Sequence, residues 1–173
     1  MNLYTCAFTG HRPKSFPWGY DERASGCVLL KEVLAAQISS LAEQGVMDWL
    51  SGMALGVDLW CAQIVLDLRK NNPALKLHAI LPCEGQEDKW PASAQTLYRS
   101  ILGQADEAIY VNREYSVNCM LERNRYMVEH SSILLAVYNG AYRSGTGMTV
   151  RYAQKLGREI IVIDPITRAF KSE

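Results

Sequence analysis

Short apolar runs alternate with segments of helical periodicity along the whole chain, and this alternation limits the folds that the chain can adopt. The runs Leu3–Phe8, Leu75–Leu81 and Ile133–Tyr138 have strand length, and a glycine, proline or asparagine follows each within two residues. The segment Cys27–Gln44 instead places aliphatic side chains on one helical face. Because repeated strand–helix units form parallel sheets with right-handed crossovers, we predict an α/β fold: a three-layer α/β/α sandwich with a mostly parallel central sheet.

The remaining elements follow from the same patterns, and we predict that residues 1–173 form a single domain. Further strands are expected around Trp49–Leu50 and at Ala108–Val111 and Ile160–Ile163. Further helices are expected at Val57–Arg69, Ala94–Leu102, from a cap at Asn118 to about Glu129, and at Thr149–Leu156.

Charge and cysteine content exclude several classes of function. Eighteen basic residues balance eighteen acidic ones, so nothing attracts the whole molecule to nucleic acid or to an anionic membrane, and we expect neither as a partner. The five cysteines are scattered and none forms a C-x-x-C pair, which argues against a disulfide framework and against a metal site. No apolar run is long enough to span a bilayer, so we expect a cytoplasmic protein.

Two glycine-bearing turns follow the first two predicted strands. The first reads Thr9-Gly10-His11-Arg12-Pro13, and the second reads Ser51-Gly52-Met53-Ala54-Leu55-Gly56-Val57-Asp58. Carboxyl ends of parallel strands meet at one edge of a sheet, where glycine lets backbone N–H groups approach a ligand. We therefore predict that ligand-binding residues of these turns include Gly10, His11, Arg12, Ser51, Gly52, Gly56 and Asp58.

Each charged residue in these turns also has a purely structural interpretation. Arg12 suits a bidentate contact with phosphate or carboxylate, although an ion pair would also explain it. His11 fits a ligand contact and a structural turn histidine about equally well. Asp58 stands near a predicted helix start, where a carboxylate stabilises the helix dipole. His78 is expected in a strand, with no chemical partner in view.

A third turn, after the fifth predicted strand, is the strongest candidate for a phosphate-binding loop. It lacks the lysine of a P-loop but combines glycines with hydroxyl side chains before a predicted helix, and Arg143 and Arg151 can add charge. The alternative is a mobile loop that binds no ligand. The ligand-binding residues predicted here are Asn139, Gly140, Ser144, Gly145, Thr146, Gly147 and Thr149.

Four motifs in this order resemble the YpsA-like (DUF1273) family of the SLOG superfamily of Rossmann-like domains. They read T-G-H-R-P, S-G-M-A-L-G-V-D, E-R-N-R-Y-M-V and S-G-T-G-M-T-V-R-Y-A. That superfamily includes the DNA-processing protein DprA and the LOG phosphoribohydrolases. The resemblance implies a nucleotide-type ligand and implies that Arg123 and Asn124 contact it. Without the resemblance, the charged run that contains these two residues would indicate a solvated helix face.

The same resemblance argues against catalysis. LOG enzymes carry a glutamate three residues after a threonine of the glycine-rich loop, but here the corresponding positions hold Thr149 and Tyr152. Asp58 or Glu122 would have to supply the carboxylate that N-glycosidic cleavage requires. We therefore expect a protein that binds or senses a nucleotide-like small molecule, with a nucleotide N-glycosidase as the alternative and single-stranded DNA binding as a weaker one.

The sequence identifies no certain cofactor beyond a bound nucleotide or phosphate. It also leaves the oligomeric state open, a homo-oligomer included.

Overall fold

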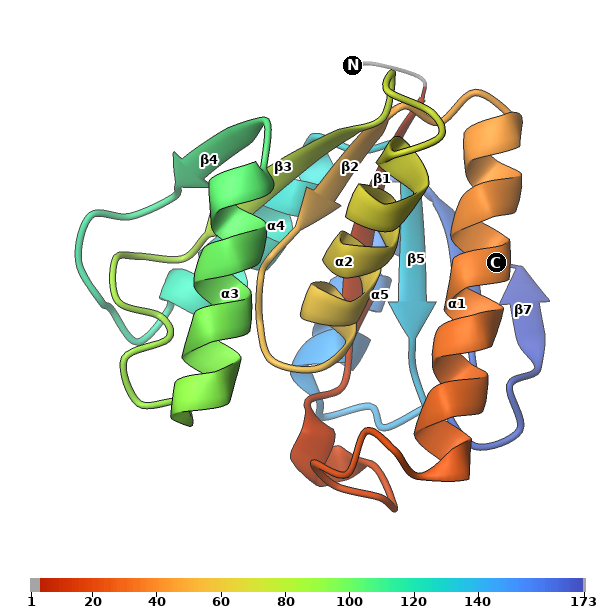
Figure 1. The fold of residues 1–173 in the computed structure, drawn as a ribbon, viewed down its shortest axis with the longest axis horizontal. Helices are drawn as coiled ribbons and strands as arrows, with labels where there is room; N and C mark the ends of the chain where they lie inside the picture. Colours follow the sequence, from red (N-terminus) through yellow and green to blue (C-terminus); the bar gives the residue numbers. More distant parts are fainter. Residues whose placement is uncertain (1–3, 173) are drawn as a thin grey trace.

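The computed structural model describes residues 4–172 and joins its strands in one seven-stranded sheet (Figure 1). The strand order is β4-β3-β2-β1-β5-β6-β7, and every neighbouring pair is parallel except β6–β7. The strands are β1 (Thr5–Gly10), β2 (Asp48–Ser51), β3 (Lys76–Leu81), β4 (Glu107–Tyr110), β5 (Ile133–Val137), β6 (Glu159–Ile163) and β7 (Phe170–Ser172).

Helices cover both faces of this sheet, which confirms the predicted α/β/α layers. Helices α1, α2 and α3 lie on the near face in Figure 1, and α4 and α5 lie behind the sheet. Their bounds are α1 (Ser25–Glu43), α2 (Val57–Arg69), α3 (Ala92–Gln104), α4 (Cys119–Glu129) and α5 (Gly145–Lys155), with a short 3-10 helix η1 at Pro13–Ser15.

Several element ends differ from the predicted ones by one or two residues, and three further differences concern β1, α5 and β7. The first strand begins at Thr5 and continues to Gly10, and Leu3 lies outside the described residues. Helix α5 begins at Gly145 instead of Thr149, because the Ser144 hydroxyl caps it four residues earlier than the apolar periodicity indicates. Strand β7 was not predicted, since its three residues carry no alternating pattern, and it pairs antiparallel at the edge of the sheet.

The central strands and one face of α1 form the core. All five residues of β5 are buried, as expected for a strand covered by helices on both sides. Helix α1 is long and apolar enough to cross a membrane by length and composition alone. Its side chains Leu30, Leu34 and Ile38 are fully buried in the core, so α1 serves here as a core helix of the α/β domain.

The strand order reverses between β1 and β5, which lie side by side at the centre of the sheet. Strands β2 to β4 extend from one side of β1, and β5 to β7 extend from the other. The segments that follow β1 and β5 therefore leave the sheet in opposite directions and open a crevice at its carboxyl edge. In open α/β sheets this switch point is where ligands bind.

Candidate functional site

A cavity of about 340 Å³ opens at this switch point. It lies between the segment after β1, the start of α2, one face of α4 and the N-terminus of α5. The lining residues are Thr9, Gly10, His11, Arg12, Lys14, Ser15, Ala54, Asp58, Met120, Arg123, Asn124, Ser144, Gly145 and Thr146. Segments from the first, second and third predicted turns thus meet in space.

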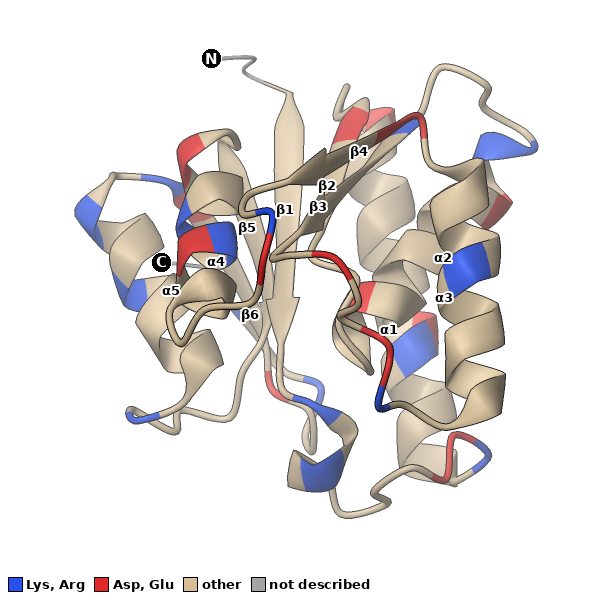
Figure 2. Cartoon of the chain, turned by 90° about the vertical axis from the view of Figure 1, so that its left-hand side faces the viewer, with Lys and Arg blue, Asp and Glu red and all other residues tan. Residues whose placement is uncertain are grey.

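The segment after β1 supplies cationic groups to the cavity. Gly10 is required for packing, because a Cβ there would lie 2.5–2.7 Å from the side-chain carbons of Val57. Arg12 is exposed, and within residues 4–172 its guanidinium has no hydrogen-bond or ion-pair partner. Lys14 of η1 lines the same wall, and Figure 2 shows this short basic turn below the strand ends. Both charges are therefore available to an anionic ligand.

His11 has a structural contact and also lines the cavity. Its side chain is buried, and its Nε2 accepts a hydrogen bond of 3.2 Å from the backbone N–H of Asn139. Burial lowers the pKa of His11, and the contact with Asn139 acts in the opposite direction. A neutral ring that accepts at Nε2 carries its proton on Nδ1. The two interpretations of His11 are thus both compatible with the structure.

The turn after β2 is held by hydrogen bonds of its own. The buried Ser51 hydroxyl donates to the backbone oxygen of Asp58 over 2.9 Å and accepts from the N–H of Met53 over 3.1 Å. Gly56 has φ of +90° and packs against Pro13, where a Cβ would lie 3.0 Å from the proline ring. Neither Ser51 nor Gly56 lines the cavity, whereas Asp58 does.

Two buried charged side chains form the floor beneath this turn. Arg123 is 3% exposed and Asp58 is 6% exposed. Burial raises the pKa of Asp58, an effect that the positive charge of Arg123 opposes. Burial likewise lowers the pKa of Arg123, which the charge of Asp58 opposes. The attraction between the two groups therefore partly offsets the effect of burial on the pKa of each.

The backbone of Gly52 and the side chain of Gln86 complete this floor. Arg123 donates from Nη1 to the carbonyl oxygen of Gly52 and from Nε to Asn124 Oδ1 over 2.8 Å. Gln86 donates to the same Gly52 oxygen over 3.3 Å and accepts from Arg123 over 3.5 Å. Gln86 follows β3 in a loop without a recognisable motif, so no signal in the sequence indicates its role. Gly52 binds Arg123 and does not itself line the cavity.

The third predicted loop forms the first turn of α5. Ser144 Oγ caps the helix by accepting from the N–H of Gly147 over 2.9 Å. The N–H groups of Gly145 and Thr146 have no acceptor within the described part of the chain. Unpaired N–H groups and the helix dipole make such a turn favourable for an anion. The glycine-rich segment therefore faces the cavity as a helix N-terminus and not as a loop.

The other predicted residues of this region lie away from the cavity. Gly147 packs closely, since a Cβ there would lie 2.8 Å from the oxygen of Ala141, and the Thr149 hydroxyl donates to the oxygen of Gly145 over 2.9 Å. Asn139 and Gly140 line a separate cavity of about 150 Å³.

Of the two candidate carboxylates, only Asp58 reaches the cavity. Glu122 is exposed and accepts a hydrogen bond of 2.6 Å from Asn112. No cluster of three or more His, Cys, Asp or Glu side chains within residues 4–172 could hold a metal ion.

The family model YpsA, described as the YspA SLOG family, matches residues 6–167. The chain belongs to this family. It is 30% identical over 154 residues to a UPF0398 protein of Bacillus velezensis, covering 86% of this chain and 82% of that protein. It is 33% identical to YoqJ, an uncharacterized SPbeta prophage-derived protein of Bacillus subtilis, covering 79% of this chain and 88% of that protein. The resemblance drawn from the four motifs is therefore confirmed.

A solved structure shares the fold of this SLOG domain. It is DNA processing protein A from Helicobacter pylori, studied for its single-stranded DNA binding mode. The TM-score is 0.63 at 20% sequence identity, and the match covers 94% of this chain and 66% of that chain. At this identity the comparison shows the Rossmann-like α/β fold.

Proposed function

We propose that this SLOG protein binds a nucleotide or nucleotide derivative in the cavity at the switch point, without turning it over. One observation carries the proposal: unpaired N–H groups of Gly145 and Thr146 face the same cavity as the unpaired Arg12 and as Lys14. A phosphate placed against the α5 N-terminus would accept hydrogen bonds from the helix and pair with the Arg12 guanidinium.

The volume and the charges of the cavity suit such a ligand. A volume of about 340 Å³ lies within the usual range of about 300–1,000 Å³ for small-molecule sites. Arg12, Lys14 and Arg123 outnumber the single carboxylate of Asp58. Asp58 and Asn124 would then serve as polar contacts to the sugar or base.

A thermal-shift screen with nucleoside mono-, di- and triphosphates and dinucleotides tests the proposal, because a ligand that binds only the native state raises its apparent stability. Calorimetry then measures the affinity of two variants for the best ligand from this screen. Arg12→Ala should lower affinity about tenfold or more, since a charge-assisted hydrogen bond is lost. Gly145→Val should also weaken binding, because a Cβ at Gly145 meets no protein atom within 4 Å and its branches project into the space for the ligand.

The control for these variants is Arg143→Ala, which removes an exposed cation that does not line the cavity. Its affinity should equal that of the unchanged protein. If Arg12→Ala and Gly145→Val both bind as tightly as this control, the ligand does not occupy this cavity.

The burial of Asp58 favours one second candidate, a nucleotide N-glycosidase. A buried carboxylate with a raised pKa in a cavity is typical of catalytic groups as well as of structural ion pairs. Incubation with purine and pyrimidine nucleoside monophosphates, followed by chromatography for free base, distinguishes the two functions. If the unchanged protein releases free base and Asp58→Asn does not, the result supports the enzyme. If no nucleotide releases free base, the enzyme is excluded for these substrates.

We also propose a cytoplasmic location. All five cysteines are free and buried, which is typical of proteins in a reducing compartment.

A further inference from the structure

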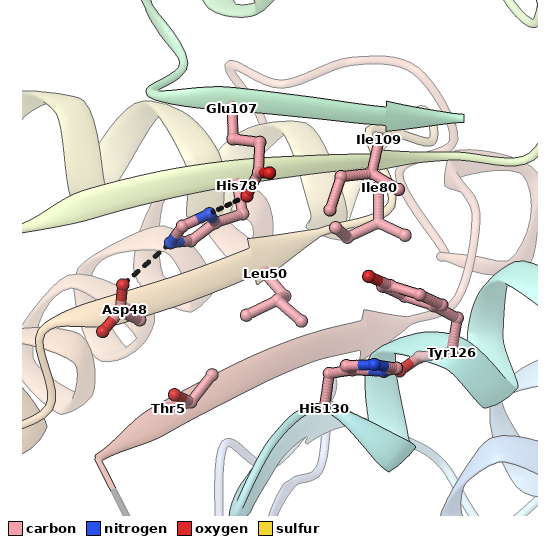
Figure 3. Close-up of a pocket in the computed structure, with 9 residues that line it drawn as sticks. All are labelled: Thr5, Asp48, Leu50, His78, Ile80, Glu107, Ile109, Tyr126 and His130. Carbon is pink, nitrogen blue, oxygen red and sulfur yellow. Dashed lines mark hydrogen bonds and ion pairs between the residues drawn. The ribbon is translucent and has the colours of Figure 1, made fainter. Parts of the chain in front are cut away.

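A second cavity, of about 250 Å³, lies at the opposite edge of the sheet, on the face that α4 covers (Figure 3). Tyr126 and His130, at the C-terminal end of α4, form one side of this cavity. The first residues of β1, β2 and β4 line another side. The lining residues are Thr5, Asp48, Leu50, His78, Ile80, Glu107, Ile109, Tyr126 and His130.

One wall of this cavity is a row of three ionisable side chains across neighbouring strands. His78 Nε2 lies 2.8 Å from Asp48 Oδ1, and His78 Nδ1 lies 3.0 Å from Glu107 Oε2. The prediction that His78 has no partner is therefore wrong. Each ring nitrogen of His78 thus faces a carboxylate, and acidic side chains outnumber the basic one in this row.

The opposite wall is aromatic and the floor is aliphatic. The rings of Tyr126 and His130 stack with centroids 3.9 Å apart. Leu50, Ile80 and Ile109 form the floor, and Figure 3 shows Tyr126 facing the acidic row across Leu50. Within the described part of the chain, Tyr126 Oη has no hydrogen-bond partner. The cavity thus combines negative charge, an aromatic ring and apolar surface.

The geometry points to a binding site for a small organic cation, an amidinium or guanidinium group on a compact apolar body. Such a planar cation donates two parallel hydrogen bonds to a carboxylate and is attracted to the face of an aromatic ring. The aliphatic floor would hold the apolar body of the ligand. This site is separate from the nucleotide cavity, because it lies at the amino-terminal edge of the strands and shares none of its residues.

Benzamidine and its uncharged analogue benzamide test the inference as a matched pair. With methyl-labelled protein, benzamidine should shift the NMR signals of Leu50, Ile80 and Ile109 in a saturable way. Benzamide should shift them at least about fivefold more weakly at equal concentration, since it lacks the positive charge. Equal affinity for both compounds, or benzamidine shifts that leave these three residues unchanged, would overturn the inference.

Two substitutions should change the affinity for benzamidine in opposite directions. Glu107→Gln removes a half-exposed carboxylate and should weaken binding about twofold to fivefold. His78→Gln removes the basic side chain that lies between the two carboxylates and should strengthen binding. The control Glu114→Gln neutralises an exposed carboxylate outside the cavity and should bind like the unchanged protein. If Glu107→Gln matches this control, or if His78→Gln weakens binding, charge does not govern recognition there.

Discussion

Replacing Gly52 with alanine places a methyl group where two buried charged side chains already meet. The new Cβ would lie 2.5 Å from Arg123 Nη1, 2.6 Å from Arg123 Cζ and 2.7 Å from Asp58 Oδ2. Ordinary contacts begin at 3.4 Å, so Arg123 would have to move by about 0.9 Å, the difference between 3.4 and 2.5 Å. That movement takes the guanidinium away from the Gly52 oxygen to which it donates.

The cost follows from the burial of the groups that must move. Inserting a methyl group into a well-packed region costs about 1–3 kcal/mol, and a buried charge that loses its partner costs about 3–5 kcal/mol. Because Arg123 can keep part of its contacts through Asn124 and Gln86, we expect the free energy of unfolding to fall by about 2–4 kcal/mol. For a chain of this length, each kcal/mol lowers the melting temperature by about 2–4 °C.

Urea unfolding followed by tryptophan fluorescence measures this change. The matched control is Gly103→Ala in α3, where an added Cβ meets nothing within 4 Å and where alanine should be neutral or stabilise by up to about 1 kcal/mol. A Gly52→Ala protein that unfolds within about 0.5 kcal/mol of the unchanged protein would refute the reasoning, since that is the usual range for surface substitutions without structural consequence.

Three further outcomes follow from the structure. Asp58 has a raised pKa in the folded state, so its titration should reduce the free energy of unfolding as pH rises from 3.8 through that raised value. Urea unfolding across pH 3–7 should show this fall in the free energy of unfolding for the unchanged protein and not for Asp58→Asn. His11 has a lowered pKa, so its contribution to stability should be complete above about pH 6.5 and should decline below it, and His11→Gln should remove that decline in the same experiment. A 20-nucleotide poly-dT strand should show no change in fluorescence anisotropy at low salt, and salt-sensitive binding would instead favour the DNA-binding alternative.

The α/β/α layers can be predicted from the sequence because burial determines which positions of each helix and strand must be apolar. A strand covered on both faces, such as Ile133–Val137, must be apolar throughout, and a helix on a sheet must be apolar on one side. The bounds of α2 are those predicted, since the glycine-rich turn and Asp58 mark its start. The start of α5 depends instead on the Ser144 cap, which adds a turn without apolar periodicity.

Other local signals do not show which contact a polar group makes in the folded chain. Asn118 occupies the N-cap position of α4, yet its side chain makes no capping hydrogen bond. Ser51 and Thr149 have the hydroxyl groups of a phosphate site, but each uses its hydroxyl to hold a backbone oxygen. A sequence shows which groups can donate a hydrogen bond and not which acceptor lies nearest.

The floor of the cavity at the switch point illustrates what only the folded chain determines. Arg123 contacts Gly52 across 71 positions of sequence, and this contact requires α4 to present Arg123 inward and its neighbour Glu122 outward. A one-residue shift of α4 that brought Glu122 to this position would remove the hydrogen bond from Arg123 to the Gly52 oxygen and would place a second carboxylate near Asp58, where the two acidic groups would repel. The buried carboxylate of Asp58 therefore favours the register of α4 that turns Arg123 inward, and the same register places Asn124 at the cavity.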